Sequence, residues 1–311
     1  MAPLSRVLHG RAGPARPGVS PRCLAGRESS AMADLMKLKF VELEAAALMS
    51  EVMFGHGFAH YGYFPNGIPP VLSAQSLGAA QMAYFEKLVE AIGTVPGGVT
   101  RILDVGSGTG ANARVLIERG FDVACVSPSR QMNEMARAKL PQGTVVVDAM
   151  FEDFDRPERH DLCLFAESFH YIDLEAALAK TALLADKGVV IFDYFRRQGF
   201  AHGDGTRGTH AAFVAAVARQ GVFDIVSDED MTAAITPTFV IHEYLKNDKV
   251  APFVRRFRAE LKRAYPWRAF VLEKLLGRTL DKLGRRTGRA ASFAQEHEYR
   301  LVVLARRGAK P

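Results

Sequence analysis

Five short apolar segments alternate with helical segments between residues 101 and 195, and this alternation constrains the fold more than any other feature. The apolar segments are rich in β-branched residues and cover 101–106, 122–127, 144–148, 161–167 and 188–195. Apolar residues recur at helical spacing in the connections, at 111–119, 129–139 and 173–184. Short strands joined by helices form a mainly parallel sheet covered on both faces. We therefore predict a doubly wound α/β fold.

Further segments flank this core, which we place at residues 98–311. The segments 223–230 and 298–306 can add two strands at one edge of the sheet, which makes seven strands in all. Residues 32–97 are predicted to form a cap of two helices and one aromatic loop, at 34–53, 73–93 and 58–70.

Charge is distributed unevenly along the chain. Residues 246–289 contain fourteen lysines and arginines against four acids, whereas residues 32–245 carry a net charge of −10. Apolar residues at helical spacing on both sides of Pro266 predict two amphipathic helices within a helical insertion at 243–290. These helices can pack with solvated arginines, bind an anionic acceptor, or contact a membrane surface that presents a lipophilic acceptor. RNA is the weakest partner, because the acidic remainder would repel phosphates.

The ends and the cysteines of the chain allow a few further expectations. Residues 1–31 hold five arginines and one acid without apolar periodicity, which fits a disordered tail, an organelle transit peptide, or a start that precedes the true one at Met32 or Met36. Cys125 and Cys163 fall within apolar segments and are predicted to be buried, so the three cysteines indicate neither a disulfide framework nor a zinc site. No apolar run reaches eighteen residues, and we expect a cytoplasmic protein without a metal site. The oligomeric state is not predicted.

A glycine-rich turn follows the first strand of the core, in "ILDVGSGTGA". Gly106, Gly108 and Gly110 let the backbone approach a ligand closely, and the helix that follows offers unpaired N–H groups. The dinucleotide fingerprint differs, because it spaces its glycines as G-x-G-x-x-G and places an acid about twenty residues later. Here Asp104 precedes the turn, where a carboxylate repels a pyrophosphate but suits an ammonium group.

The segment "LDVGSGTG" resembles motif I of the class I S-adenosylmethionine-dependent methyltransferases, and the resemblance extends well over residues 98–195 and more loosely over 222–306. It implies a Rossmann-like methyltransferase fold and S-adenosyl-L-methionine as the cofactor. Asp104, Gly106, Gly108 and Gly110 would hold the methionine part of that cofactor. In this family an insertion before the last strand commonly forms a lid over the substrate, which implies such a role for 243–290.

The same resemblance assigns the rest of the cofactor site. The second strand of the family usually ends in an acid that binds the ribose, whereas this chain has Ser127, as cyclopropane-fatty-acid and tocopherol-type relatives have Ser or Thr. Gln131 is a candidate substitute, one position away from the glutamine of those relatives. For the adenine, Asp148 with the N–H of Ala149 matches best. Glu152 and Asp153 stay open as alternatives, as does a solvated acidic loop.

Catalytic candidates follow the fourth strand, where open α/β sheets bind ligands. "CLFAESFHYID" places Glu167, His170 and Tyr171 there, and His170 is the best general base because its ordinary pKa is near neutrality. A histidine that only packs beside the cofactor is the alternative. "HYGYFPNG" resembles the H-x-G-Y/F segment of tocopherol-type and sterol-type methyltransferases, which implies that Tyr61 and Tyr63 line the site, unless they belong to the core.

These observations favour S-adenosylmethionine-dependent methyl transfer to a small hydrophobic or aromatic metabolite, with the acceptor atom (O, C or N) open. Two other functions compete with this one. A nicotinamide-dependent oxidoreductase is disfavoured by the glycine spacing and by the lack of a Tyr-x-x-x-Lys arrangement. A non-catalytic module that binds S-adenosylmethionine or RNA would use the basic insertion.

Overall fold

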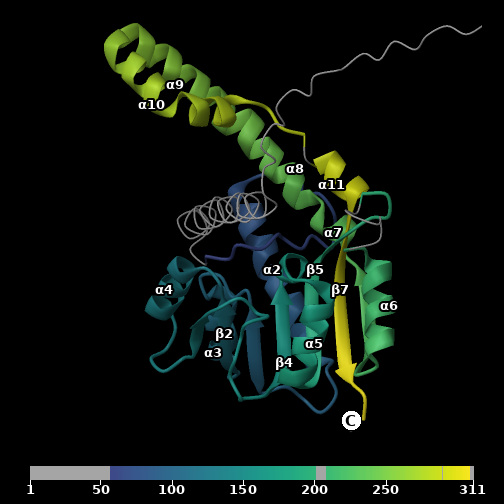
Figure 1. Ribbon diagram of the computed structural model, residues 1–311. Helices are drawn as coiled ribbons and strands as arrows, with labels where there is room; N and C mark the ends of the chain where they lie inside the picture. Colours follow the sequence, from purple (N-terminus) through teal and green to yellow (C-terminus); the bar gives the residue numbers. More distant parts are fainter. Residues whose placement is uncertain (1–56, 201–207, 289, 309–311) are drawn as a thin grey trace, which may run out of the picture. The chain divides into compact units, whose positions relative to one another are not determined.

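The computed structural model describes residues 57–200, 208–288 and 290–308. Within them, seven strands form one sheet in the order β3–β2–β1–β4–β5–β7–β6 (Figure 1). The strands are β1 Arg101–Val105, β2 Asp122–Ser127, β3 Val146–Asp148, β4 His160–Ala166, β5 Ala185–Arg196, β6 Phe223–Asp230 and β7 His297–Arg306. The first five pair in parallel, and β7 runs antiparallel to both β5 and β6. The predicted doubly wound, mainly parallel sheet is confirmed.

Helices cover both faces of this sheet. They are α2 Ala74–Gly93, α3 Ala111–Glu118, α4 Arg130–Lys139, α5 Leu174–Leu184 and α6 His210–Gln220. Helices α2, α3 and α4 contribute to one buried apolar cluster, and α5 and α6 contribute to the other. Successive residues of a strand point to opposite faces, so Ile102 belongs to the first cluster and Leu103 to the second. Helix α6 is the one element among these five that the sequence did not predict.

The connection from β3 to β4 is a loop that covers the sheet without a helix. Phe151 and Phe154 in this loop are buried in the second apolar cluster, on the face of the sheet that α5 and α6 also cover. The ring of Phe151 meets Phe165 of β4 edge-on, with 5.4 Å between the ring centroids. Two aromatic side chains therefore take the place of a helix there.

A helical insertion separates β6 from β7. It consists of α7 Thr232–Ile235, α8 Pro237–Tyr244, the π-helical turn η2 Leu245–Val250, α9 Ala251–Ala264, α10 Pro266–Gly284 and α11 Ala290–Glu296. Pro266 occupies the first position of α10, where its missing N–H costs nothing. The two helices predicted on either side of Pro266 are therefore present, and Arg258 of α9 binds Glu273 and Asp281 of α10.

Some expectations fall outside the described residues, namely those for the tail at 1–31, the helix at 34–53 and Cys23. The two other cysteines are described. Cys125 and Cys163 are buried free thiols, which confirms the prediction, and burial raises the pKa of each. No helix in the described ranges is long and apolar enough to cross a membrane.

Candidate functional site

The glycine turn after β1 is held in a backbone conformation that only glycine adopts readily. Gly106, Gly108 and Gly110 have φ angles of 75°, 56° and 74°. A β-carbon on Gly106 would lie 2.3 Å from the β-carbon of Ser168, and one on Gly110 would lie 2.9 Å from that of Ala136. At Gly108 the nearest atom would be a backbone oxygen 4.0 Å away, so this position stays open for a ligand.

Besides the hydroxyl of Ser107, two carboxyl or amide oxygens at the turn are buried without a hydrogen-bond partner among the described residues. They are Oδ2 of Asp104, near the end of β1, and Oδ1 of Asn112, in the first turn of α3. Asp104 is 2% exposed, and burial raises its pKa to about 7. A buried acceptor without a donor is costly, so this arrangement calls for a ligand that brings N–H groups.

The end of β2 carries the predicted ribose-side residues. Ser127 is buried, and its hydroxyl accepts a long hydrogen bond of 3.4 Å from the N–H of Ser129. Its carbonyl oxygen accepts from the side-chain amide of Asn133 at 2.8 Å. Gln131 lies in the first turn of α4 and is exposed, which leaves its amide accessible.

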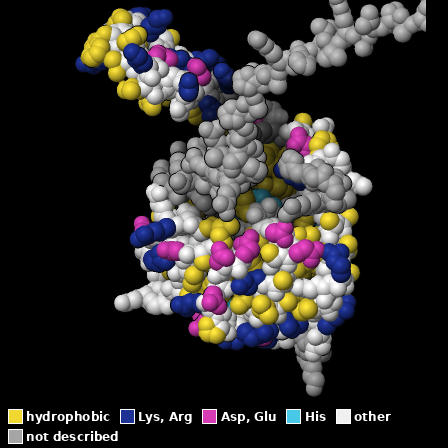
Figure 2. Space-filling view, in the orientation of Figure 1, with side chains coloured by type: hydrophobic (Ala, Val, Ile, Leu, Met, Phe, Trp, Pro, Cys, Tyr) yellow, Lys and Arg dark blue, Asp and Glu magenta, His cyan; other side chains and the backbone are white. Residues whose placement is uncertain are grey.

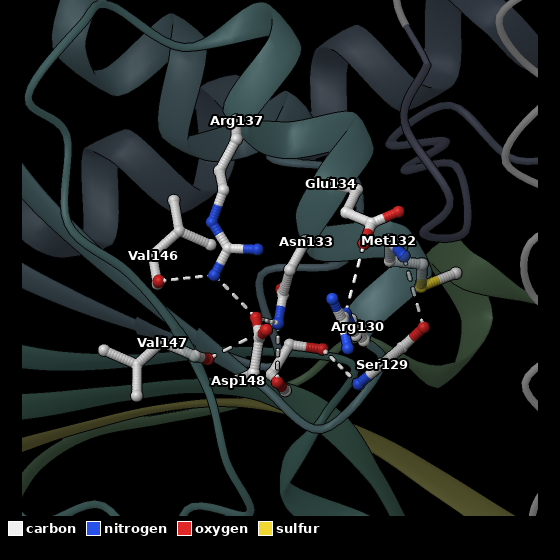
Figure 3. Close-up of polar contacts among 10 residues, drawn as sticks. Ser129, Arg130, Met132, Asn133, Glu134, Arg137, Val146, Val147 and Asp148 are labelled. Carbon is white, nitrogen blue, oxygen red and sulfur yellow. Dashed lines mark hydrogen bonds and ion pairs between the residues drawn. The ribbon is translucent and has the colours of Figure 1, made fainter.

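Asp148 lies beside Ser127, because these two residues pair in the register of β2 and β3. Figure 3 shows that its carboxylate belongs to a network with α4, in which Oδ1 accepts from Arg137 at 2.6 Å and from Asn133 at 2.8 Å. The Arg137 guanidinium lowers the pKa of Asp148. Ala149 donates its N–H to the carbonyl oxygen of Ser127 at 3.3 Å, so that donor is engaged within the protein.

Glu152, which the sequence kept as an alternative for the adenine side, has a feature that Asp148 lacks. Its Oε2 is buried and has no hydrogen-bond partner among the described residues. Asp153, the other alternative, is exposed. Of the three acids considered for the adenine side, Glu152 therefore has the oxygen that most needs a donor.

Glu167 follows β4 directly and is the one non-glycine residue with a positive φ, 59°, in the described part of the chain. Its Oε1 accepts from the backbone N–H of Tyr61 and from the hydroxyl of Tyr299, each at 2.7 Å. Burial raises the pKa of Glu167 to about 8. This carboxyl group thus ties the aromatic loop to the end of β4, and it joins two of the predicted site residues.

His170 is held by a partner that the sequence analysis missed. Its Nδ1 lies 2.8 Å from Oδ1 of Asp193, and its backbone N–H donates to Oδ2 of the same carboxylate at 3.1 Å. Oδ1 also accepts from the N–H of Tyr194 at 2.7 Å, and the Asp193 side chain is 1% exposed. The available signal was a single acid within the apolar segment "VVIFDYF".

Aromatic rings surround the His170 side chain that Asp193 holds. The His170 ring lies 3.8 Å from the ring of Tyr171 and 4.2 Å from that of Tyr194, measured between centroids. Tyr61 contacts Phe239 of α8 at 4.8 Å and Phe293 of α11 at 6.1 Å. The insertion between β6 and β7 therefore contributes to the aromatic wall of the site through two residues, Phe239 and Phe293, that lie outside the predicted range 243–290.

His60 and Tyr63 of the aromatic loop do not reach the Glu167 side of the site. His60 is buried, stacks on Tyr84 at 4.1 Å, and its Nδ1 lies 2.8 Å from the carbonyl oxygen of Tyr61. Tyr63 packs partly buried against the apolar cluster that α2 helps to form. Tyr61 is thus the member of this loop that reaches the Glu167 side of the site.

Residues 103–192 match a family model described as a methyltransferase domain, and this range contains the glycine turn, Ser127, Glu167 and His170. The chain carries a methyltransferase domain. The matched range includes Asp104 and the glycines of the turn, the segment that resembles motif I. The seven-stranded sheet with its antiparallel β7 is Rossmann-like, as in solved methyltransferase structures.

Curated relatives of the methyltransferase domain match it over part of their length. An uncharacterised methyltransferase of Bacillus cytotoxicus is 31% identical over 109 residues, which cover 34% of this chain and 50% of that protein. One of Mycobacterium tuberculosis is 35% identical over 95 residues, which cover 30% of this chain and 39% of that protein. The chain thus spans half or less of the length of these relatives.

Solved structures share the fold of the methyltransferase domain and its flanks. A geranyl diphosphate methyltransferase in complex with GPP and sinefungin has a TM-score of 0.62 and 16% identity, over 88% of this chain and 98% of that one. A cyclopropane synthase from Mycobacterium tuberculosis has a TM-score of 0.58 and 16% identity, over 86% and 98%. A geranyl diphosphate C-methyltransferase from Streptomyces coelicolor, with S-adenosyl-L-homocysteine and geranyl-S-thiolodiphosphate, has a TM-score of 0.59 and 15% identity, over 84% and 92%.

Proposed function

We propose that this chain transfers a methyl group from S-adenosylmethionine to a small hydrophobic or aromatic acceptor. The observation that carries the proposal is the buried Asp104 carboxylate, whose Oδ2 has no partner among the described residues beside a turn that is open at Gly108. Solved structures with the same fold were obtained with S-adenosyl-L-homocysteine or sinefungin, which supports this class of cofactor.

The residues around the turn fit the parts of S-adenosylmethionine. Asp104 would accept from the ammonium group of the methionine part, which satisfies its orphan oxygen. Ser127 and Gln131 would hold the ribose, and Asp148 or Glu152 would receive the adenine amino group. When bound, this cofactor supplies an electrophilic methyl group on a positively charged sulfur.

The protein's main task in such a displacement is to position the acceptor. Proximity and orientation supply roughly 7–11 kcal/mol of the barrier reduction in well-aligned reactions. Tyr61, Tyr171 and Tyr194 offer ring faces that suit an apolar or aromatic acceptor and a neighbouring cation. Burial raises the pKa of Tyr171 to about 12 and raises those of the other two as well, so all three phenols stay protonated at neutral pH.

His170 would act as the general base for acceptors that must lose a proton. Asp193 would accept a hydrogen bond from the Nδ1–H of His170, which leaves Nε2 as the basic nitrogen. A positioned base of this kind contributes about 10²- to 10⁴-fold to the rate. An acceptor that is already nucleophilic would not need it, so the effect of removing His170 distinguishes these two acceptor classes.

The acceptor class is supported by the aromatic wall and by the neighbours named for geranyl diphosphate, which carries an apolar isoprenoid chain. The test is the transfer of a labelled methyl group from S-adenosylmethionine to panels of phenols, isoprenoids and amines by the full chain. Transfer to members of the first two panels supports the proposal. Transfer to amines alone, or to no panel when the cofactor binds, contradicts the proposed acceptor class.

A further inference from the structure

The hairpin formed by α9 and α10 exposes large apolar side chains to solvent. Phe253 is 68% exposed, Trp267 73%, Phe270 65% and Leu275 75%. Such side chains also occur singly on ordinary surfaces, but here they are concentrated on two consecutive helices. Figure 2 shows hydrophobic and basic atoms intermixed over these helices.

Basic side chains accompany the apolar ones in large excess. Residues 246–289 hold fourteen lysines and arginines and four acids, and three of the acids are paired with Arg258 or Arg263 in the hairpin. A cavity of about 440 Å³ lies at the C-terminal end of α10. It is lined by Asp281, Thr287 and five cationic residues, namely Lys246, Arg278, Lys282, Arg285 and Arg286. Most of the positive charge therefore has no acid to neutralise it within this segment.

The apolar and basic groups are in contact with each other. The Arg268 guanidinium lies 4.9 Å from the ring centroid of Tyr265, and the Lys274 ammonium lies 5.7 Å from that of Phe270. Long basic side chains of this kind cover apolar surface with their alkyl stems and keep the charge at a polar boundary. At the boundary of an anionic bilayer, the rings enter the acyl region and the cations meet the headgroup phosphates.

We propose that the α9–α10 hairpin docks this protein onto an anionic lipid surface. Charge complementarity favours an anionic lipid surface over a second copy of this chain, because a second hairpin would bring the same excess of positive charge and would be repelled. The apolar rings select a bilayer over a purely polar polyanion, which offers them no apolar phase. This docking does not depend on the proposed methyl transfer, and either can fail without the other.

Trp267 is the only tryptophan of the chain, so its fluorescence reports on the hairpin alone. The full chain is titrated with vesicles of phosphatidylcholine, with and without one third phosphatidylglycerol. We expect a shift of emission to shorter wavelength and co-sedimentation with the anionic vesicles only. The double variant Lys274→Gln/Arg278→Gln should weaken partitioning about 25-fold, since each basic residue near such a surface contributes about fivefold.

A second pair of variants separates the hairpin from general electrostatic attraction, including that of the basic residues 1–31. Phe253→Ser/Phe270→Ser should weaken partitioning at least about tenfold, because insertion of each ring is lost. Leu183→Ser/Val226→Ser, at positions 65% and 50% exposed elsewhere, should leave it unchanged.

Four results would overturn the proposal. Three of them are no emission shift with anionic vesicles, equal binding to neutral vesicles, and unchanged partitioning of the Phe253→Ser/Phe270→Ser variant. The fourth is an emission shift that vesicles do not produce, but that a higher concentration of the protein alone or the addition of polyuridylic acid does. Circular dichroism confirms that each variant is folded before it is compared.

Discussion

Replacing Asp104 by asparagine should stabilise the protein without its cofactor and weaken cofactor binding at the same time. Burial raises the pKa of this carboxyl group from 3.8 to about 7. The folded protein then holds the proton more tightly than the unfolded chain, so the free energy of unfolding falls as the pH rises from about 4 to about 7. Because the pKa of Asp104 rises by about three, the free energy of unfolding above pH 7 is lower by as much as about 4 kcal/mol. The substituted side chain carries no charge and removes this loss.

The stability effect is measured by urea denaturation at pH 5 and pH 8. At pH 8 the free energy of unfolding of Asp104→Asn should exceed that of the wild type by about 1–3 kcal/mol, since a buried amide also has a desolvation cost. At pH 5 the difference should shrink, because the wild-type carboxyl group is then protonated. Asp122→Asn, at the exposed first residue of the neighbouring strand, is the control and should change neither value.

The binding effect has the opposite sign. A hydrogen bond between a carboxylate and an ammonium group contributes about 1.5–3 kcal/mol, so the affinity of Asp104→Asn for S-adenosylmethionine should fall about 10- to 150-fold. The wild-type affinity should rise with pH up to about 7 as Asp104 ionises, and the variant should lack this rise. A variant that binds as tightly as the wild type, or that is less stable at pH 8, would refute the reasoning.

Two further predictions address the catalytic side and the turn. His170→Ala should lower transfer to an acceptor that must lose a proton by about 10²- to 10⁴-fold and leave cofactor affinity unchanged, as measured by turnover and calorimetry. Asp186→Asn, at the other end of β5 from Asp193, is its control, and equal losses in both variants would contradict the role of the base. Gly106→Ala should unfold at a Tm several degrees lower and lose measurable cofactor binding, because its β-carbon would lie 2.3 Å from that of Ser168. An alanine variant with wild-type affinity would show that the turn adapts.

The sheet could be predicted because its signals are local. Each strand of the core is a short apolar run bounded by turn or helix residues, and the expected bounds agree with β1 to β7 within a few residues. The glycine turn was equally predictable, since the segment from Ile102 to Ala111 contains most of the strand, the turn and the start of the helix. These features depend on neighbouring residues and on a period of two or of 3.6.

The partners of the site residues could not be predicted, because they depend on how distant segments meet. Asp193 reaches His170 only through the pairing of β4 with β5, and Tyr299 is 132 residues away from Glu167 in the chain. Arg137 occupies one oxygen of Asp148 through the approach of α4 to β3, which no sequence pattern indicated. The contributions of α8 and α11 to the aromatic wall were missed for the same reason.

The central claim is that the turn around Asp104 binds S-adenosylmethionine, and calorimetry of the full chain tests it most directly. S-adenosylmethionine, S-adenosylhomocysteine, NADH and NADPH are titrated in parallel. We predict micromolar binding of the first two and no binding of the nicotinamides. Binding of the nicotinamides alone, or of none of the four, would contradict the account.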